Sequence, residues 1–499
     1  MTFYKDLKDQ ELLLPPNIRD MIPKNHICHL VDKIIQNMDL SDIEKEYEGA
    51  GHPAYHPKLI LKLLILGQID GIRSSRIIAK NARENVVYMY MAGLLQPDFR
   101  TISDFRKNNL EIVKSSFHEV VKFAKILGMV SLGHICIDGT KIKANASNHS
   151  AVTKDDFLKL KELVERELEE GIRIDEEEDR IHGDKNIDEL PGNIFDKTIA
   201  EKLKEKYQSG SKEQKEKIKK QVDKIEKEIE KSESAISATD PESRFMPNNK
   251  KVTEYSYNPQ VTVDSSFGII ISNDVTSEVR DANQLQPQII QTEENVGALP
   301  EGTKVSADNG YSSSKNLKFM KDKKLDGYIP DEKTASNLNK NEGKPENPFG
   351  KENFEYEPAE DCFICPNGKK LTFRFEYVDI TKNRNVRIYK GTQCKQCPDR
   401  EKCSKNSRDG KVIKNYEGME EERRKMADKL RSKEGKLIYQ TRKKVVECIF
   451  GHIKRNLGFR EFLLRGINGA KIEFNLTCIA SNLRRMWNFL NGFSEVRCC

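Results

Sequence analysis

The sequence predicts an α/β protein in which an all-helical N-terminal region precedes a core of strands and helices that two insertions interrupt. The first 130 residues show helical periodicity broken by Pro and Gly, and β-type apolar runs begin near residues 134 and 260. A charged segment and a cysteine-rich segment separate these runs. The boundaries are 1–130 for the helical region, 131–150 and 255–330 for the first part of the core, 151–254 for the charged insertion, 331–415 for the cysteine-rich insertion and 416–499 for the C-terminal helical part of the core.

Length and composition agree with a large chain that builds its own core. The 499 residues are 36% hydrophobic, and a net charge of +6 is compatible with a polyanionic partner without requiring one. The first residues are charged and no run of about 18 apolar residues occurs, so we expect no signal peptide, no membrane partner and a cytoplasmic location. The eleven cysteines are then expected to be thiols or metal ligands rather than disulfides.

Several short helices with basic residues near their N-termini are expected in the N-terminal region. The segment Thr101-Ile-Ser-Asp-Phe-Arg106 is typical of a helix start with Thr101 or Ser103 as N-cap. Such helices suit a helix-turn-helix-like DNA-binding module. A plain helical bundle would show the same periodicity, and no side chain is assigned to sequence recognition.

The charged insertion carries two narrow apolar seams at helical spacing. The residues are Ile218, Val222, Ile225 and Ile229 in one seam, and Phe157, Leu160, Val164 and Leu168 in the other. Two antiparallel helices packed on each other explain both seams, so we predict a helical hairpin. The alternative is a coiled-coil arm for dimerisation.

The core strands resume after this insertion. The segment from Gln260 to Ser272 holds two apolar runs around an Asp-Ser-Ser-Phe-Gly turn, which predicts an antiparallel hairpin. A helix at 283–295, a strand at Val305, a helix at 313–323 and a strand at Tyr328-Ile329 follow. The expected order is therefore strand, hairpin, helix, strand, helix, strand and a late helix.

The cysteine-rich insertion has two parts. Residues 331–353 are polar and predict a loop or a partly disordered segment. The next part combines five cysteines with β-type runs at 371–378 and 385–389. The cysteines are Cys362, Cys365, Cys394, Cys397 and Cys403. Two Cys-x2-Cys pairs supply four thiolates in the tetrahedral geometry of Zn²⁺, so this part predicts a zinc-ribbon-like unit with structural Zn²⁺. The fifth cysteine is surplus and the sequence does not show which four bind; redox-active or free thiols are the alternatives.

Three acidic residues stand where a metal-dependent nuclease would place them. Asp138 and Asp308 each end a short apolar run before a Gly or Asn-Gly turn, so each is expected at the C-terminal tip of a buried strand. Glu447 lies on an expected helix, two turns before Lys454 on the same face. Such carboxylates can hold two Mg²⁺ or Mn²⁺ ions about 3.5–4 Å apart, an arrangement that serves phosphodiester chemistry. Among the other carboxylates, Asp264, Asp274 and Asp281 are interpreted as structural or supporting, and Glu473 is the nearest competitor of Glu447.

Five segments along the chain carry a family resemblance. They are Gly71–Arg76 through Thr101–Arg106, Asp138-Gly-Thr-Lys, Tyr257-Asn-Pro-Gln260, Asp308-Asn-Gly-Tyr311, and Glu447 through Gly466. Together they resemble an IS1182-type insertion-sequence transposase of the IS4-like DDE group over nearly the full length. The resemblance implies an RNase H-like catalytic core, Asp138, Asp308 and Glu447 as the metal-binding triad, and Lys454 as the lysine seven residues after the glutamate. Tyr439 and Arg442 lie one residue further from Glu447 than the group's Tyr-x2-Arg-x3-Glu-x6-Lys signature has them, so their roles stay open.

The resemblance implies a transposase that binds inverted-repeat ends of double-stranded DNA, as a homodimer on DNA, and cleaves and joins strands by metal-dependent hydrolysis and transesterification. The expected phosphate contacts are Lys443, Lys444, Lys454, Arg455 and Arg465. An ordinary charged helical face is the alternative for these residues. For the whole chain, the alternatives are an inactive or domesticated DNA-binding regulator and a metal-dependent nuclease that does not join.

Overall fold

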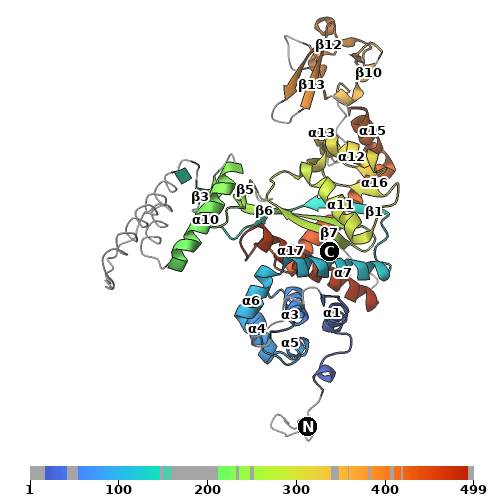
Figure 1. The fold of residues 1–499 in the computed structure, drawn as a ribbon. Coiled ribbons are helices and arrows are strands. Elements are labelled where there is room, and N and C mark those ends of the chain that lie inside the picture. Colours follow the sequence, from blue (N-terminus) through green and yellow to red (C-terminus); the bar gives the residue numbers. More distant parts are fainter. Residues whose placement is uncertain are drawn as a thin grey trace, which may run out of the picture.

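The computed structural model places a helical region, a central sheet and a second, separate sheet along the molecule (Figure 1). The residues that the structure describes are 17–41, 54–146, 151–152, 154, 157–158, 212–231, 235–247, 252–338, 348–357, 359–379, 384–404, 410–416 and 420–492.

The N-terminal region is built from short helices, as the sequence predicted. They are the 3-10 turn η1 Ile18–Met21, α1 Ile27–Gln36, α3 Pro57–Ile69, α4 Ser75–Glu84, α5 Val86–Met91, α6 Phe99–Asn108 and α7 Leu110–Ile126. Every residue of α3 except Lys58 is buried, so this helix is enclosed by its neighbours rather than amphipathic. The region therefore packs around α3.

Helix α6 starts earlier than the sequence suggested. Its N-cap is Asp98, whose side chain accepts a hydrogen bond from the Arg100 N–H at 3.2 Å. An aspartate is among the best N-cap residues, and its charge suits the positive end of the helix dipole. The expectation that Thr101 or Ser103 caps the helix was wrong, because both lie inside it.

The core is one sheet whose strands come from distant parts of the chain. They are β1 His134–Gly139, β2 Ile142–Lys143, β5 Arg244–Pro247, β6 Thr253–Asp264, β7 Ile269–Thr276, β8 Lys304–Ser306 and β9 Asp326–Tyr328. The C-terminal half of β6 pairs antiparallel with β1 and β7, and its N-terminal half pairs with β2 and β5. Strand β8 runs parallel to β1, and β9 runs parallel to β8. The central order is therefore β7-β6-β1-β8-β9.

The helices that link these strands also follow the predicted order. Helix α11 Leu285–Val296 comes after the β6–β7 hairpin, and α12 Ser314–Asp322 joins β8 to β9. The hairpin turn closes at Gly268, which has a φ of +68°. Glycine suits this position because other residues rarely adopt a positive φ.

The C-terminal helices close the core. They are α15 Glu420–Arg431, α16 Lys433–Gly451, the π-helical turn η8 His452–Asn456 and α17 Ile467–Leu490. Helix α17 packs on α3, α7 and β7, so one continuous hydrophobic core extends from the N-terminal helices into the sheet. In the described part of the chain no helix combines the length and the apolarity needed to cross a bilayer, and this includes the 24-residue α17.

The charged insertion contributes the helix α10 Lys212–Lys231 and a small sheet of β3 Ala151–Val152 and β4 Ile236–Ser237. Val222, Ile225 and Ile229 are buried, as their spacing predicted. Of the second seam, Phe157 is buried, while residues 160, 164 and 168 lie outside the described residues. The helical hairpin therefore stays a prediction.

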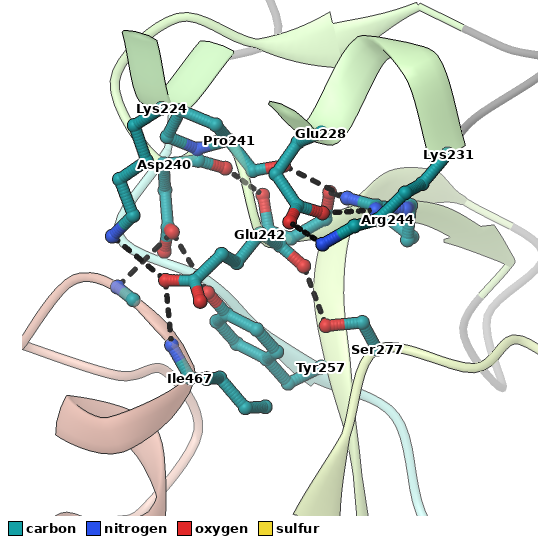
Figure 2. Close-up of polar contacts among 12 residues, drawn as sticks. Lys224, Glu228, Lys231, Asp240, Pro241, Glu242, Arg244, Tyr257, Ser277 and Ile467 are labelled. Carbon is teal, nitrogen blue, oxygen red and sulfur yellow. Dashed lines mark hydrogen bonds and ion pairs between the residues drawn. The ribbon is translucent and has the colours of Figure 1, made fainter. Parts of the chain in front are cut away.

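A polar network fixes the base of this insertion to the core (Figure 2). The Tyr257 hydroxyl on β6 donates to Oδ1 of the buried Asp240 at 2.7 Å. Oε2 of Glu242 accepts from the Ile467 N–H at the start of α17 at 3.2 Å and pairs with Lys224 of α10 at 2.8 Å. The network thus joins α10, the central sheet and the last helix.

The cysteine-rich insertion forms a separate antiparallel sheet at the end of the molecule opposite the N-terminal helices (Figure 1). Its strands, in sequential order, are β10 Glu355–Glu357, β11 Cys362–Ile364, β12 Lys370–Asp379, β13 Arg384–Gly391 and β14 Val412–Tyr416. The runs at 371–378 and 385–389 are strands, as predicted.

The polar stretch before this sheet is not all loop. Helix α13 Glu332–Leu338 lies within it, so the loop expected over 331–353 was wrong at its start. Asp331 accepts a hydrogen bond from the Thr334 N–H at 2.7 Å, which is the bond of an N-cap. The Asp-Glu-Lys-Thr segment carried this signal, and the surrounding polar composition obscured it.

Candidate active site

Asp138 and Asp308 lie at the carboxyl ends of neighbouring parallel strands. The last paired residues of β1 and β8 are Cys136 and Ser306, and each aspartate stands two residues further along. Parallel neighbours run about 4.8 Å apart. The two carboxylates therefore come together at one edge of the sheet, although 170 positions separate them in the sequence.

Both carboxylates are held by the turn that follows them. The Gly139 N–H donates to Oδ1 of Asp138 at 2.9 Å, and the Gly310 N–H donates to Oδ1 of Asp308 at 2.8 Å. Burial raises the pKa of Asp138 to about 7; Arg442 opposes this rise, and Asp308 adds to it. Burial likewise raises the pKa of Asp308. Crowded, partly buried carboxylates of this kind favour a nearby cation.

Asp281 is a third carboxylate beside this pair. It begins the 3-10 turn η4 Asp281–Asn283, and it raises the pKa of both other aspartates. Its Oδ1 accepts from Asn258 Nδ2 at 2.7 Å, from Gln260 Nε2 at 2.9 Å and from Lys141 Nζ at 3.3 Å. The Tyr311 hydroxyl donates to Oε1 of Gln260. These contacts agree with the supporting role expected for Asp281, and they tie β6 to the turn that carries Asp308.

Arg442 contacts the site directly, which sequence reasoning had not assigned. Its Nη1 donates to Oδ2 of Asp138 at 3.0 Å from the buried face of α16. The guanidinium carbon also lies 5.2 Å from the centre of the Tyr439 ring. Tyr439 and Arg442 have the mutual spacing of the Tyr and Arg in the family signature, and this spacing could have indicated a role at the site. Their distance from Glu447 is one residue longer than in the signature, so the sequence left their roles open.

Glu447 and Lys454 occupy different positions relative to the aspartates. Nζ of Lys454 donates to Oγ1 of Thr140 at 2.6 Å, two residues past Asp138, and burial lowers the pKa of this lysine. Glu447 is exposed on α16 and makes no hydrogen bond or ion pair with any residue that the structure describes. The structure thus brings Asp138 and Asp308 together, places Lys454 on the turn that follows Asp138, and leaves Glu447 outside the contacts of both aspartates.

The other expected DNA contacts lie on the surface. Lys443 and Lys444 on α16, Arg455 in η8 and Arg465 before α17 are all exposed. Arg465 Nε donates to the Asn145 carbonyl at 3.3 Å, so this side chain also contacts the chain just after β2. The side chains of all four are accessible to solvent.

The rival carboxylates are engaged elsewhere. Asp264 accepts from the Leu132 N–H at 2.8 Å, and Asp274 pairs with Lys471 at 2.8 Å, which agrees with their interpretation as structural. Glu473 is buried in α17 and pairs with Arg73 at 3.2 Å. It therefore anchors the N-terminal helices rather than joining the strand-end aspartates.

The five clustered cysteines do not share one environment. Four of them, Cys365, Cys394, Cys397 and Cys403, line a single small cavity beside the second sheet. Cys362 is buried in β11 and does not line it. Within the described ranges, no three acidic, histidine or cysteine side chains stand as a preformed metal site.

Comparisons with known proteins match two parts of the chain. Residues 364–487 match the family model described as Transposase DDE domain, and residues 16–108 match that described as Transposase domain (DUF772). Both matches support a DDE-type transposase. Neither covers half of the chain, and no curated protein sequence matches it.

Among solved structures, the chain is similar to the piggyBac transposase in a synaptic complex with hairpin DNA, determined by cryo-electron microscopy. The identity is 9%, the match covers 94% of this chain and 77% of that chain, and the TM-score is 0.30. At that TM-score the likeness supports no statement on fold or function.

Proposed function

We propose that the chain is a DDE-type DNA transposase with an RNase H-like core, which binds transposon ends and catalyses metal-dependent cleavage and strand transfer. The observation that carries the proposal is the pair Asp138 and Asp308, side by side at the ends of parallel strands β1 and β8. The sheet order β7-β6-β1-β8-β9 and the two transposase family matches support it.

The residues at this edge fit a divalent metal. Carboxylate oxygens are the ligands that Mg²⁺ and Mn²⁺ prefer. Burial raises the pKa of both aspartates, and a bound cation would stabilise their charged forms. Asp138 and Asp308 would hold the metal, with Glu447 as the third ligand that the resemblance assigns. When bound, two such ions would polarise the attacking oxygen and stabilise the leaving oxygen of a phosphodiester.

The remaining residues of the site would bind and orient DNA. Thr140 accepts a hydrogen bond from Lys454 in the turn after β1, which supports a role for this lysine in binding the phosphate that reacts. The exposed cations Lys443, Lys444 and Arg455 extend this positive surface along α16 and η8. Pairing of two transposon ends would place a homodimer on DNA, by analogy with end-joining enzymes.

The products of one reaction test this function. The purified chain is incubated with DNA carrying its flanking inverted repeats, a target plasmid and Mg²⁺, with Asp138→Asn as the inactive control. Cleavage followed by joining to the plasmid supports the transposase. Cleavage without joining would instead indicate a nuclease, and a mobility shift without cleavage would indicate a DNA-binding regulator.

A further inference from the structure

Four cysteine side chains from separate segments converge on one cavity of about 30 Å³. Cys365 lies in the turn between β11 and β12, Cys394 and Cys397 follow β13, and Cys403 ends the short helix α14 Arg400–Cys403. The cavity therefore gathers thiols from three separate segments of the insertion.

The chain makes room for this convergence. A Cβ at Gly391 would collide with Sγ of Cys394, and a Cβ at Gly410, which has a φ of +73°, would lie 2.7 Å from Cβ of Cys394. Gly391 at the end of β13 and Gly410 before β14 thus leave the space that the Cys394 side chain occupies. Larger residues at either position would push this sulfur out of the cavity.

The surroundings of the sulfur atoms suit thiolates. The Lys369 N–H donates to Sγ of Cys365 at 3.2 Å, and Asn367 Nδ2 donates to Sγ of Cys397 at 3.5 Å. Outer hydrogen bonds of this kind orient metal ligands and are typical of metal sites. Lys369, Arg400 and Lys411 also line the cavity, and their positive charges would balance the net charge of −2 on a divalent ion with four thiolates.

Cys362 stands apart from this set. It pairs with Thr372 inside the sheet, is 2% exposed and does not line the cavity. The sequence spacing Cys362-x2-Cys365 therefore does not describe the pair that acts together. Cys403, which the spacing made the surplus residue, takes the place of Cys362.

The second sheet has a small apolar core, which a metal centre would stabilise. Its buried apolar cluster consists of Phe354, Phe363, Leu371, Tyr389 and Ile413. A unit of roughly 70 residues with so small a core seldom reaches useful stability without a disulfide or a metal. All nine cysteines in the described ranges are free, so no disulfide supplies this stability there.

We propose that Cys365, Cys394, Cys397 and Cys403 bind one structural Zn²⁺ ion, and that Cys362 does not. Four thiolates are a common ligand set of structural zinc. Rotation of the cysteine side chains would close the sulfur atoms on the ion, because metal binding and local folding are coupled in such sites. The proposal does not depend on the DNA chemistry of the carboxylate site.

Metal analysis of the full-length chain tests the assignment. Protein is purified under reducing conditions without chelator, and its zinc and iron are measured by mass spectrometry for the wild type and for five single Cys→Ser variants. We expect about one zinc per chain in the wild type and in Cys362→Ser, and a loss of at least half of it in the other four variants. Cys362→Ser is the matched control, since it removes a nearby buried thiol.

A second measurement separates ligand loss from unfolding. Each metal-free protein is titrated with Co²⁺, and the thiolate-to-cobalt absorption and the circular dichroism of the whole chain are recorded together. Four-thiolate absorption in Cys362→Ser, with weakened absorption and near-wild-type helical signal in the other four, supports the site. Zinc lost from Cys362→Ser but kept in Cys403→Ser would overturn the ligand set. Iron in place of zinc, or reduced wild-type protein that binds neither zinc nor cobalt, would overturn the proposal itself.

Discussion

Replacing Glu473 with glutamine should destabilise the joint between the N-terminal helices and the C-terminal helix. Glu473 is 3% exposed and faces two arginines whose side chains are each 11% exposed. Arg73 lies 3.2 Å from one carboxylate oxygen and Arg106 lies 3.9 Å from the other. The same carboxylate accepts from the Leu463 N–H at 2.7 Å, so one side chain neutralises and positions several groups.

The expected loss follows from the charge left behind. Burial lowers the pKa of Arg106, Glu473 opposes this shift and Arg73 adds to it. Without the carboxylate, two guanidinium groups remain together in a buried place. Removing one partner of a buried ion pair costs about 3–5 kcal/mol. A glutamine oxygen can keep the bonds from Leu463 and Arg73, so we expect a cost within this range and not above it.

Thermal unfolding and hydrogen exchange provide the assay. At roughly 2 °C per kcal/mol for a large chain, the melting temperature should fall by about 6–10 °C. Amides of α4, α6 and α17 should exchange faster, while those of the cysteine-rich sheet should not change. Glu301→Gln is the control, because Glu301 pairs with Lys324 at 2.6 Å on the surface and such pairs contribute about 1 kcal/mol or less.

This variant also decides which glutamate serves the carboxylate site. Glu473→Gln should still cleave DNA in the presence of metal at temperatures where it is folded, because its partners are arginines and not the strand-end aspartates. A melting temperature equal to that of Glu301→Gln would refute the anchoring argument. Loss of cleavage by folded Glu473→Gln, with cleavage retained by Glu447→Gln, would show that the third ligand is Glu473.

Three further predictions concern the site and its surroundings. Asp138→Asn, Asp308→Asn and Glu447→Gln should each abolish nearly all cleavage while end binding in a mobility-shift assay persists, because an amide lacks the charge that a dication needs; double variants should be little worse than single ones. Changing Lys443, Lys444 and Arg455 together should weaken DNA binding and reduce its salt slope by up to about 3, and an unchanged slope would mean that these cations are merely solvated. Burial lowers the pKa of His134 to about 4, so below pH 6.5 protons bind the unfolded chain in preference to the folded one, and this histidine makes stability fall as the pH falls. Between pH 6.5 and 4, the free energy of unfolding of His134→Gln should therefore fall less than that of the wild type, as measured by urea midpoints. Asp138, whose raised pKa has the opposite effect on stability, is present in both proteins, so its contribution cancels in the comparison. Equal changes of the two midpoints with pH would contradict the prediction.

The order of the core elements was predictable because the buried strands are also short apolar runs bounded by turn residues, and such runs are visible in the sequence. The run ending at Asp138 and the hairpin around Asp264 to Gly268 have the period and the turn residues of strands, and the structure has strands at both places. Parallel pairing of β1 with β8 was not visible in the sequence. It depends on contacts across 170 positions, which no local pattern records.

If the proposed zinc ligands are correct, the cysteines show a limit of predicting a metal site from the spacing of residues. Cys362 and Cys365 have the separation of a metal-binding pair, yet Cys362 lies within the paired part of β11, while Cys365 lies in the turn after it. Strand β11 ends at Ile364, so Cys362 is inside the strand and Cys365 is the first residue after it. A sequence rule that counts residues between cysteines has no access to the point at which pairing stops.

The position of the third carboxylate shows the same limit on a helix. Sequence spacing states which residues share a face of α16, but packing decides how the helix is rotated about its axis. Val446 and Ile449 are fully buried, and Arg442 on that side reaches Asp138. Glu447 lies five residues after Arg442, which is about 140° further around an α-helix, so the two side chains leave α16 on different sides. We expect that metal binding by Glu447 is accompanied by a rotation of α16 that moves Arg442 away from Asp138, because the metal then supplies the charge that Arg442 supplies in this structure.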